Sequence, residues 1–337
     1  MSAGASVPAS ARTAEGYGLV LLAAGCWAGG GLLAKWLFTM PGPSTAGWLW
    51  QPLGIVIDPL LLSAARATVA FVFVLAYLAL RRRDLLVVRA RHLPFLAAFG
   101  VFGLAMVHFS YFKTISLTGV ATAILLEYLA PVIVLVFSVL LLGERLTWSL
   151  PAAVALSIVG CALMVGFVGG GGLVVSGEGI AWGLASAVFF AGYALMGRYA
   201  AHRFAPWTLL LYGLGAATVF WMVVLGGPAR VISLLGDGRA LAAVVFMAIV
   251  STVIPFGAFL KALHLIDATK ASITSTVEPV IAGIAAWFLF AEHLGWLQLF
   301  GGVMVVAAVM LSQVSTRTPA EMPVVAVESF GEGPRDA

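Results

Sequence analysis

The sequence predicts an all-α membrane protein of ten transmembrane helices, built as two inverted repeats of five helices each. Its composition excludes an ordinary soluble protein, because 62% of the residues are hydrophobic and 9% are charged. In soluble globular domains, roughly 45–50% of the residues are apolar and roughly 25% are charged. The apolar residues form ten runs close to the length of about 20 residues that a helix needs to cross a bilayer. In addition, one set of residues recurs at a constant separation.

That set defines an internal repeat. Lys113, Pro131, Glu144, Leu146 and Trp148 recur as Lys261, Pro279, Glu292, Leu294 and Trp296, each 148 residues later. No gap is needed between the first match and the last. Internally repeated membrane bundles are the usual construction of secondary transporters. Because each half contains an odd number of spans, the two halves must insert in opposite directions, and the repeat is predicted to be inverted.

The ten spans follow from the apolar runs, which are bounded by Gly, Pro and charged residues. In chain order they are 17–38, 59–80, 93–112, 118–142, 147–168, 179–198, 207–226, 240–263, 269–290 and 294–314. The first half therefore covers residues 17–168 and the second covers residues 179–314. A Gly-rich linker at 169–178 joins them.

Both ends of the chain are predicted to be cytoplasmic. Residues 1–16 are small and polar and precede an apolar run that is followed by many more spans. We therefore interpret that run as an uncleaved first helix and not a secretory signal, and residues 1–16 as a cytoplasmic tail. Residues 315–337, with scattered Pro and charges, are expected to be a disordered tail. If both termini are cytoplasmic, 13 of the Lys and Arg residues lie on that side and five on the other. This excess satisfies the positive-inside rule for a multi-pass protein of the cytoplasmic membrane.

The first half carries an insertion on its outer side. Trp27 matches Phe190 and Lys35 matches Arg198 at an offset of 163, whereas Pro59 matches Pro206 at 147. Sixteen extra residues therefore lie within the stretch 39–58, which is rich in Pro, Gly and Trp. A surface hairpin resting at the interface, where Trp is favoured, is the preferred interpretation. A lid over the transport pathway is the alternative.

Two carboxylates, Glu127 and Glu278, each lie nine residues into a predicted span. An ionisable group at this depth costs a few kcal/mol on insertion scales and is a functional candidate by default. Pro131 and Pro279 lie within one turn of them and free backbone carbonyls, which must be satisfied inside the bundle or by water in a cavity. We expect the acids, with the adjoining Tyr128, to face a central aqueous cavity and bind a cationic group or a proton. Pairing with Lys or Arg, or capping of a Pro-broken turn, is the structural alternative.

Four aromatic or imidazole side chains are further candidates. His108 and Tyr111 share one face of the third span, and Trp27 and Tyr193 lie in the first and sixth. Aromatic residues with polar tips can line a pocket for an amphipathic solute, although packing is their commoner role. His108 would also be suited to a proton relay.

Charged residues near span ends allow two interpretations. Arg66 and Lys35 could attract an anionic group of the solute, but snorkelling to the headgroups is the commoner fate of such side chains. Glu144 and Glu292 stand at span ends, where a structural role in a loop or in helix capping is expected.

Several classes of function have no sequence support. The chain shows no nucleotide-binding motif, no catalytic nucleophile motif and no zinc signature. We therefore predict no catalytic residue, no metal site and no cofactor. The lack of a nucleotide-binding motif also disfavours ATP-driven transport by this chain alone. Cys26 and Cys161 fall in separate spans and are interpreted as small packing residues. The net charge of +4 arises from basic loop residues, so no nucleic-acid partner is expected.

The repeated segments resemble the EamA domain of the drug/metabolite transporter superfamily. The resemblance rests on Leu129-Ala130-Pro131-Val132 followed by Leu142-Gly143-Glu144-Arg145-Leu146, and on Glu278-Pro279-Val280 followed by Ala291-Glu292-His293-Leu294. It covers roughly residues 17–314. The first half departs from the pattern in having Ala130, and not Glu, before Pro131. The resemblance implies ten helices in two inverted halves, a substrate cavity between them and alternating access, without shared catalytic residues.

We therefore expect a secondary transporter whose partners are a small-molecule solute and the lipid bilayer. Export of amino acids or related small metabolites is the leading hypothesis. It follows from the family resemblance, because most bacterial relatives in that family are similar to exporters of this kind. An importer or exchanger of the same fold is the alternative, and a channel or an intramembrane enzyme is the alternative of a different class. Proton coupling is compatible with either direction, and the sequence leaves the oligomeric state open.

Overall fold

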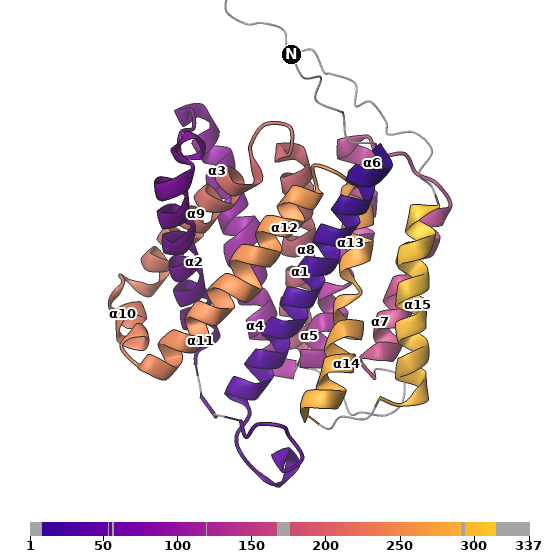
Figure 1. The fold of residues 1–337 in the computed structure, drawn as a ribbon, viewed down its shortest axis with the longest axis horizontal. Helices are drawn as coiled ribbons and strands as arrows, with labels where there is room; N and C mark the ends of the chain where they lie inside the picture. Colours follow the sequence, from indigo (N-terminus) through magenta and orange to yellow (C-terminus); the bar gives the residue numbers. More distant parts are fainter. Residues whose placement is uncertain are drawn as a thin grey trace, which may run out of the picture.

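The computed structural model describes residues 9–52, 54–55, 57–118, 120–166, 176–290 and 294–314, and all the regular secondary structure in them is helical. The helices pack side by side in a single bundle (Figure 1). Nine helical segments within these ranges are long and apolar enough to cross a membrane, and Ser149–Met164 forms a shorter apolar helix. The chain is therefore an all-α, multi-pass membrane protein.

The first half of the chain contains seven α-helices within the described residues. In chain order they are α1 (Ala9–Phe38), α2 (Pro59–Arg81), α3 (Leu93–Gly100), a π-helical turn (Val101–Ala105) leading into α4 (Met106–Thr118), α5 (Val120–Glu127), α6 (Ala130–Leu142) and α7 (Ser149–Met164). Short 3₁₀ turns occur at Pro43–Thr45, Arg83–Leu86 and Ala90–His92.

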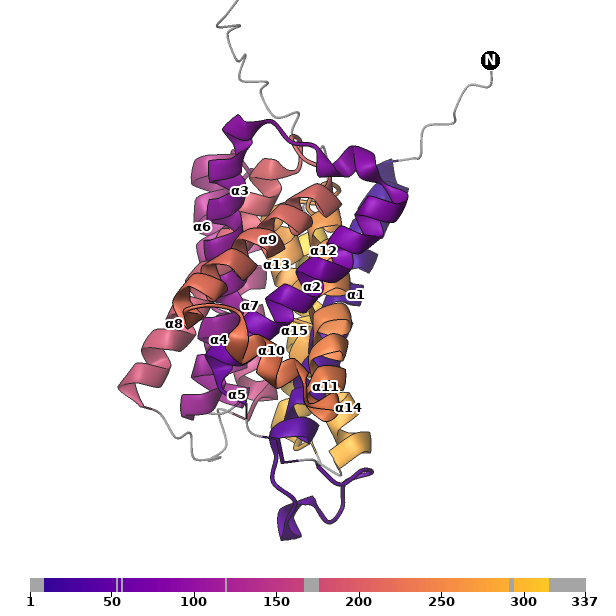
Figure 2. The same ribbon diagram turned by 90° about the vertical axis from the view of Figure 1, so that its left-hand side faces the viewer.

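The second half repeats this order with one additional short helix. Its elements are α8 (Gly177–Ala200), α9 (Pro206–Leu225), α10 (Ala229–Leu235), α11 (Gly238–Ala248), a π-helical turn (Ile249–Val253) leading into α12 (Ile254–Ala262), α13 (Ala268–Ser275), α14 (Glu278–Phe290) and α15 (Trp296–Gln313). α1 begins and α15 ends on the same side of the bundle (Figure 1). The connection between α1 and α2 projects from the opposite side (Figure 2).

Local sequence signals set several of these helix ends. The side chain of Asp58 accepts hydrogen bonds from the backbone N–H groups of Leu60 and Leu61 at 3.0 and 3.1 Å, and Pro59 occupies the first helical position of α2. This N-cap satisfies amide groups that have no partner within the helix. Gly226 ends α9 in the left-handed conformation, with φ of 73°, which glycine adopts without a steric penalty.

Two predicted boundaries differ from the structure. α1 begins at Ala9, eight residues before the predicted start of the first span at 17. The extension is polar and Ala-rich, and its Glu15 pairs with Lys261 at 2.7 Å, so it lies at the end of the bundle. The predicted fifth span, 147–168, contains α7 of 16 residues, and the Gly-rich linker lies largely outside the described residues.

The predicted fourth and ninth spans are each broken into two helices. The breaks fall between α5 and α6 and between α13 and α14, where Pro131 and Pro279 stand at the starts of the second helices. A proline provides no N–H for the hydrogen bond to the preceding turn. Glu127 is the last residue of α5, and Glu278 is the first of α14. Both carboxylates therefore lie beside the breaks and not in the middle of continuous helices.

The backbone irregularities recur at the separation found in the sequence. The π-helical turns at Val101–Ala105 and Ile249–Val253 start 148 residues apart, as do α6 at Ala130 and α14 at Glu278. π-Helical turns inside α-helices are rare and occur frequently at functional sites. The irregular backbone thus lies in the third and fourth predicted spans of the first half and in the equivalent eighth and ninth spans of the second half.

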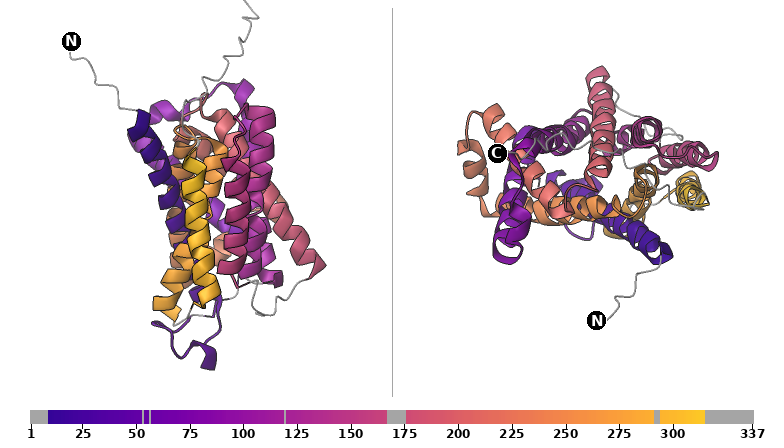
Figure 3. Two further views of the ribbon diagram at one scale, coloured as in Figure 1. Left: turned by 90° about the vertical axis from the view of Figure 1, so that its right-hand side faces the viewer. Right: turned by 90° about the horizontal axis from the view of Figure 1, so that it is seen from above.

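Helices from the two halves pack against one another in reciprocal pairs. α1 packs against α12, and α8 packs against α4, while α2 lies against α9 and α7 against α15. The last pair forms one edge of the bundle (Figure 3). The α1–α12 and α8–α4 contacts are therefore counterparts in which the two halves exchange roles, and the other two contacts each join equivalent helices.

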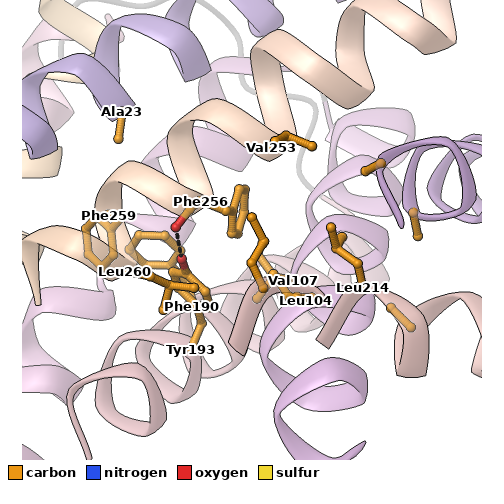
Figure 4. Packing of buried hydrophobic residues seen from close by; sticks show 14 of the residues in the cluster. Ala23, Leu104, Val107, Phe190, Tyr193, Leu214, Val253, Phe256, Phe259 and Leu260 are labelled. Carbon is orange, nitrogen blue, oxygen red and sulfur yellow. Dashed lines mark hydrogen bonds between the residues drawn. The ribbon is translucent and has the colours of Figure 1, made fainter. Parts of the chain in front are cut away.

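The centre of the bundle contains an aromatic cluster (Figure 4). Tyr193 lies between Phe256 and Phe259, with ring centroids 5.0 and 5.7 Å away, and Phe190 is 6.2 Å from Tyr193. The hydroxyl of Tyr193 donates a hydrogen bond to the carbonyl of Phe256 at 2.8 Å. These contacts fix α8 against α12.

Glycines allow a close helix approach at the α7–α15 edge. A Cβ atom added at Gly301 would lie 2.6 Å from the carbonyl oxygen of Gly160, and one at Gly160 would lie 2.8 Å from the carbonyl oxygen of Gly301. Distances this short require the two helix backbones to move apart. α7 and α15 therefore depend on glycine at both positions.

We expect Gly301→Ala to lower the melting temperature of the purified protein, because overpacking of this kind costs about 1–3 kcal/mol. Gly18→Ala in α1 is the matched control, because an added Cβ there meets no atom within 4 Å and alanine favours the helix. Thermal unfolding in detergent measures both. Equal melting temperatures for Gly301→Ala and the wild type would contradict the close approach.

Candidate functional site

A cavity of about 620 Å³ lies among helices of both halves. Seven of the eight residues predicted as substrate-binding line it, namely Trp27, Arg66, His108, Tyr111, Glu127, Tyr128 and Glu278. They come from α1, α2, α4, the break between α5 and α6, and the start of α14. Residues spread over 252 positions of the sequence are thus brought to one place, and their role in binding stays a prediction.

The cavity extends to the side of the bundle where α1 ends. Lys35 and Thr39 line it at the end of α1, and Leu294 and Gln298 line it around the start of α15. The connection 39–58 rests beside this mouth. The N–H of Leu49 donates to the carbonyl of Leu289 at 2.9 Å, so the connection contacts the same helix, α14, that lines the cavity.

The opposite side of the bundle is tied together by ionic contacts. Arg198 of α8 donates from Nη1 to the carbonyl of Leu263 at 2.5 Å and lies 3.4 Å from the carboxylate of Asp267. Lys270 lies 3.2 Å from the other oxygen of Asp267. These contacts join α8 to the turn between α12 and α13 and close the bundle on the side where the chain begins.

Glu144 adds a further contact on the closed side. Its carboxylate accepts hydrogen bonds from the backbone N–H of Ala268 at 2.8 Å and from the hydroxyl of Thr269 at 2.6 Å. A carboxylate at a helix N-terminus satisfies free N–H groups there. Burial raises the pKa of this carboxyl, and the nearby Asp267 raises it further. The predicted capping role is confirmed for Glu144, whereas Glu292 lies outside the described residues.

The two buried carboxylates each have a hydroxyl partner. Tyr128 donates to Oε2 of Glu278 at 2.7 Å and also lies 3.2 Å from the carbonyl of Ser275. Ser186 of α8 donates to Oε2 of Glu127. Tyr128 therefore links the break in one half to the break in the other. Each acid keeps one oxygen that accepts no hydrogen bond from any described residue, and both acids line the cavity.

Arg66 is the buried cation of the site. Its side chain is held by the π-helical turn, with Nε and Nη2 donating to the hydroxyl of Thr252 at 3.2 and 2.7 Å and Nη2 donating to the carbonyl of Ser251 at 3.1 Å. The guanidinium also lies 5.0 Å from the ring centre of Phe112, a favourable cation–π distance. Only 4% of Arg66 is exposed. Snorkelling to the membrane surface, the commoner fate expected from sequence, is therefore wrong for this residue.

Tyr193 is the predicted candidate that does not line the cavity. It has no exposed surface, and its hydroxyl donates a hydrogen bond to the carbonyl of Phe256 (Figure 4). Its neighbour Phe190 lines the cavity instead. The prediction that Tyr193 faces the solute is corrected accordingly, because its ring is buried against Phe190, Phe256 and Phe259.

Sequence reasoning missed three hydroxyl residues of the site. Ser186 holds Glu127, while Ser251 and Thr252 hold Arg66. A signal for the last two was present, since the equivalent positions of the first half, Gly103 and Leu104, carry no hydroxyl. A polar pair present in only one half indicates a function that the equivalent positions of the other half do not have.

The arrangement suits a small solute with both polar and apolar parts. Two carboxylates, one guanidinium and aromatic rings converge on one enclosed volume, where few waters screen their charges. Tyr111 lines the same cavity as Arg66, Glu127 and Glu278. Within the described residues, no group of three or more His, Cys, Asp or Glu side chains could hold a metal ion.

Comparison with known proteins assigns this architecture to a family. The model of the EamA-like transporter family matches residues 14–166 and again residues 177–313. An uncharacterized transporter of Archaeoglobus fulgidus is 32% identical over 220 residues, which are 62% of this chain and 74% of that protein. A probable terminal-alkyne amino-acid exporter of Streptantibioticus cattleyicolor is 28% identical over 229 residues, 66% of this chain and 74% of that protein.

Two further proteins agree with this assignment. A pseudopaline exporter of Pseudomonas aeruginosa is 26% identical over 234 residues, which are 69% of this chain and 79% of that protein. A solved crystal structure superimposes with a TM-score of 0.68 at 22% identity, covering 90% of this chain and 97% of the other. At this identity the likeness shows the fold.

We expect Tyr128→Phe to lower the melting temperature of the purified protein, because it leaves the buried carboxylate of Glu278 without its donor. Hydrogen bonds to charged groups are worth about 1.5–3 kcal/mol. Tyr77→Phe is the matched control, since Tyr77 is 45% exposed and its ring contact with Trp207 is kept. A melting temperature of Tyr128→Phe equal to that of the control would contradict the link between the two helix breaks.

Proposed function

Because the chain belongs to the EamA-like transporter family, we propose that it is a secondary transporter that exports an amino acid or a related small metabolite across the cytoplasmic membrane. The observation that carries this proposal is the cavity of about 620 Å³, which reaches one side of the bundle while ion pairs tie the other. A carrier that works by alternating access needs a site of this kind, open to one side at a time.

The proposed architecture is ten helices in two inverted halves, with α7 as the fifth span. Four observations support it: the two ranges matched by the family model, the π-helical turns 148 residues apart, the equivalent helix breaks, and the reciprocal packing of α1 on α12 and α8 on α4. Repeats of 17–168 and 179–314, joined by 169–178, account for all four.

We propose that both termini are cytoplasmic, as the excess of Lys and Arg on that side suggests. The tails 1–16 and 315–337 would then lie inside the cell, and the 39–58 connection would lie outside. In this orientation the cavity mouth beside Thr39 faces away from the cytoplasm. The structure would then correspond to the outward-open state, and the contacts around Asp267 would form the inner gate.

The amino-acid part of the proposal rests on charge. The cavity holds Arg66 and Lys35 together with Glu127 and Glu278, so it offers groups of both signs to a zwitterion. The aromatic side chains in its wall suit an apolar substituent. Two of the relatives are exporters by name, one of them of an amino acid, and this supports the proposed direction.

Counterflow in proteoliposomes tests the transporter proposal. Purified protein is reconstituted into vesicles loaded with unlabelled amino acids, and uptake of each labelled amino acid is measured against empty vesicles. We expect saturable exchange of at least one amino acid. Flux that does not saturate would indicate a channel, and an absence of exchange for every amino acid and every related metabolite tested would contradict the proposal.

We expect Glu127→Gln and Glu278→Gln to reduce counterflow and to alter its dependence on pH, because each removes a buried negative charge from the cavity. If the acids bind the proton or a cationic group of the solute, the neutral amide cannot replace them. Glu178→Gln is the matched control, since Glu178 is exposed and outside the cavity lining. Wild-type transport and pH dependence in both variants would rule out the carboxylates as binding groups.

A further inference from the structure

Three polar atoms in the cavity wall have no hydrogen-bond partner among the residues that the structure describes. They are Nε1 of Trp27, Nε2 of His108 and the hydroxyl of Ser251, and all three residues line the cavity. A buried polar atom without a partner costs about 1–3 kcal/mol, so such atoms are few in native proteins. Because all three belong to cavity-lining residues, a hydrogen-bonding group of a bound solute would satisfy them.

These atoms lie around Arg66. The backbone carbonyl of Ser251 accepts from Nη2 of Arg66 at 3.1 Å, and the free hydroxyl of Ser251 lies against Gly30 of α1, another residue of the cavity wall. Trp27 and His108 both pack on the ring of Phe256, with centroids 5.3 and 4.8 Å away. The three free atoms and the buried cation therefore belong to one region of the cavity.

Arg66 itself has unused hydrogen-bonding capacity. A guanidinium has five N–H donors, and the described contacts of Arg66 engage Nε and Nη2, while Nη1 donates to no described residue. Its acceptors are a hydroxyl and a carbonyl, both neutral. No carboxylate of a described residue forms an ion pair with it, so its positive charge is not balanced by direct contact with an acid.

We propose that Arg66, Trp27 and Ser251 form a subsite that binds the carboxylate of the transported solute. Nη1 of Arg66, the indole N–H and the hydroxyl of Ser251 would each donate to its oxygens. Carboxylates accept up to four hydrogen bonds, and an arginine is their preferred partner in a buried site. This subsite rests on the proposed transporter function and names the chemical group by which the cavity holds its solute.

The charge balance of the cavity favours a carboxylate over a phosphate. Arg66 and Lys35 face Glu127 and Glu278 across the same volume. A phosphate ester carries close to two negative charges at neutral pH, and the two acids would repel it more strongly than a singly charged group. With one buried guanidinium in the subsite, a single negative charge is the better match.

The other residues around the subsite indicate which part of the solute would lie next to its carboxylate. The rings of Trp27, Phe190 and Phe256 form a continuous aromatic surface, with Trp27 centroids 5.8 and 5.3 Å from the other two. An apolar substituent of the solute would pack there. His108 also lines this part of the cavity, and its Nε2 makes no hydrogen bond to a described residue, so it would be available to a polar group of the solute.

Binding of a matched pair of probes tests the subsite. The probes are 3-phenylpropionate and 3-phenylpropionamide, which share an aromatic substituent and differ in the negative charge. Calorimetric titration of the purified full-length protein in nanodiscs measures both affinities. We expect the wild type to bind the carboxylate more tightly than the amide, and Arg66→Gln to weaken carboxylate binding at least tenfold while changing amide binding little.

Two conservative variants keep the test decisive if Arg66→Gln does not fold. Trp27→Phe and Ser251→Ala each remove a donor that makes no hydrogen bond to a described residue, so the fold loses little. Trp221→Phe and Ser272→Ala are the matched controls, because those buried donors are also without partners but lie outside the cavity lining. We expect weaker carboxylate binding in the first pair and unchanged binding in the second.

The outcomes separate this subsite from the transporter proposal. Equal affinities for the two probes, failure of the wild type to bind either, or unchanged carboxylate binding in Trp27→Phe and Ser251→Ala would overturn the subsite. Competition by inorganic phosphate as strong as that by 3-phenylpropionate would overturn its preference for a carboxylate. Counterflow of a labelled amino acid by the wild type would still support the transporter in each of these cases, whereas its absence would count against the transporter alone.

Discussion

Within a bilayer, each backbone N–H and C=O group must find a partner inside the protein, and the two broken helices of this chain depend on that constraint. The breaks beside Pro131 and Pro279 release carbonyls at the depth of the membrane core. The structure meets this cost with side chains, since Tyr128 reaches the carbonyl of Ser275 and Cys161 lies 3.8 Å from that of Thr276. Irregular backbone at this depth is tolerated where it lines a cavity, and here the cavity is where the carboxylates lie.

The same constraint explains why the charges are so few and so specifically placed. Glu127 and Glu278 adjoin the breaks, while Arg66 reaches the π-helical turn, where Thr252 donates to the carbonyl of Met247 and still accepts from the guanidinium. Each charge thus occupies a point at which the helical hydrogen-bonding pattern is already disturbed. Polar backbone and hydroxyls supply the solvation that lipid cannot, and they leave part of each charged group directed to the cavity.

The sequence could predict the features that depend on local or repeated patterns. Pro131 and Pro279 were expected to free backbone carbonyls, and the helix breaks lie beside them, although the spans 118–142 and 269–290 were predicted as continuous. The position of Glu144 after an apolar run correctly indicated a capping role. The difference between the halves marks Ser251 and Thr252 as polar exceptions, but their pairing with Arg66 could not be predicted, because Thr252 lies 186 residues away and no periodicity connects the two. Tyr193 was misplaced for the same reason, since which face of a buried apolar helix meets the cavity is decided by packing and not by composition.

Symmetry between the proposed halves would make the two access states equal in energy, so the differences between the halves must set their balance. At the closed side Arg198 and Lys270 both contact Asp267. At the mouth, Lys35 occupies the position equivalent to Arg198, but Gly119 stands in place of Asp267 and Thr122 in place of Lys270. The residues equivalent to the ionic cluster of the closed side therefore lack its acidic member. In the proposed alternating-access cycle, this asymmetry would favour the state in which the cavity is open at the mouth, and a solute bound in the proposed subsite would have to offset it for the transporter to turn.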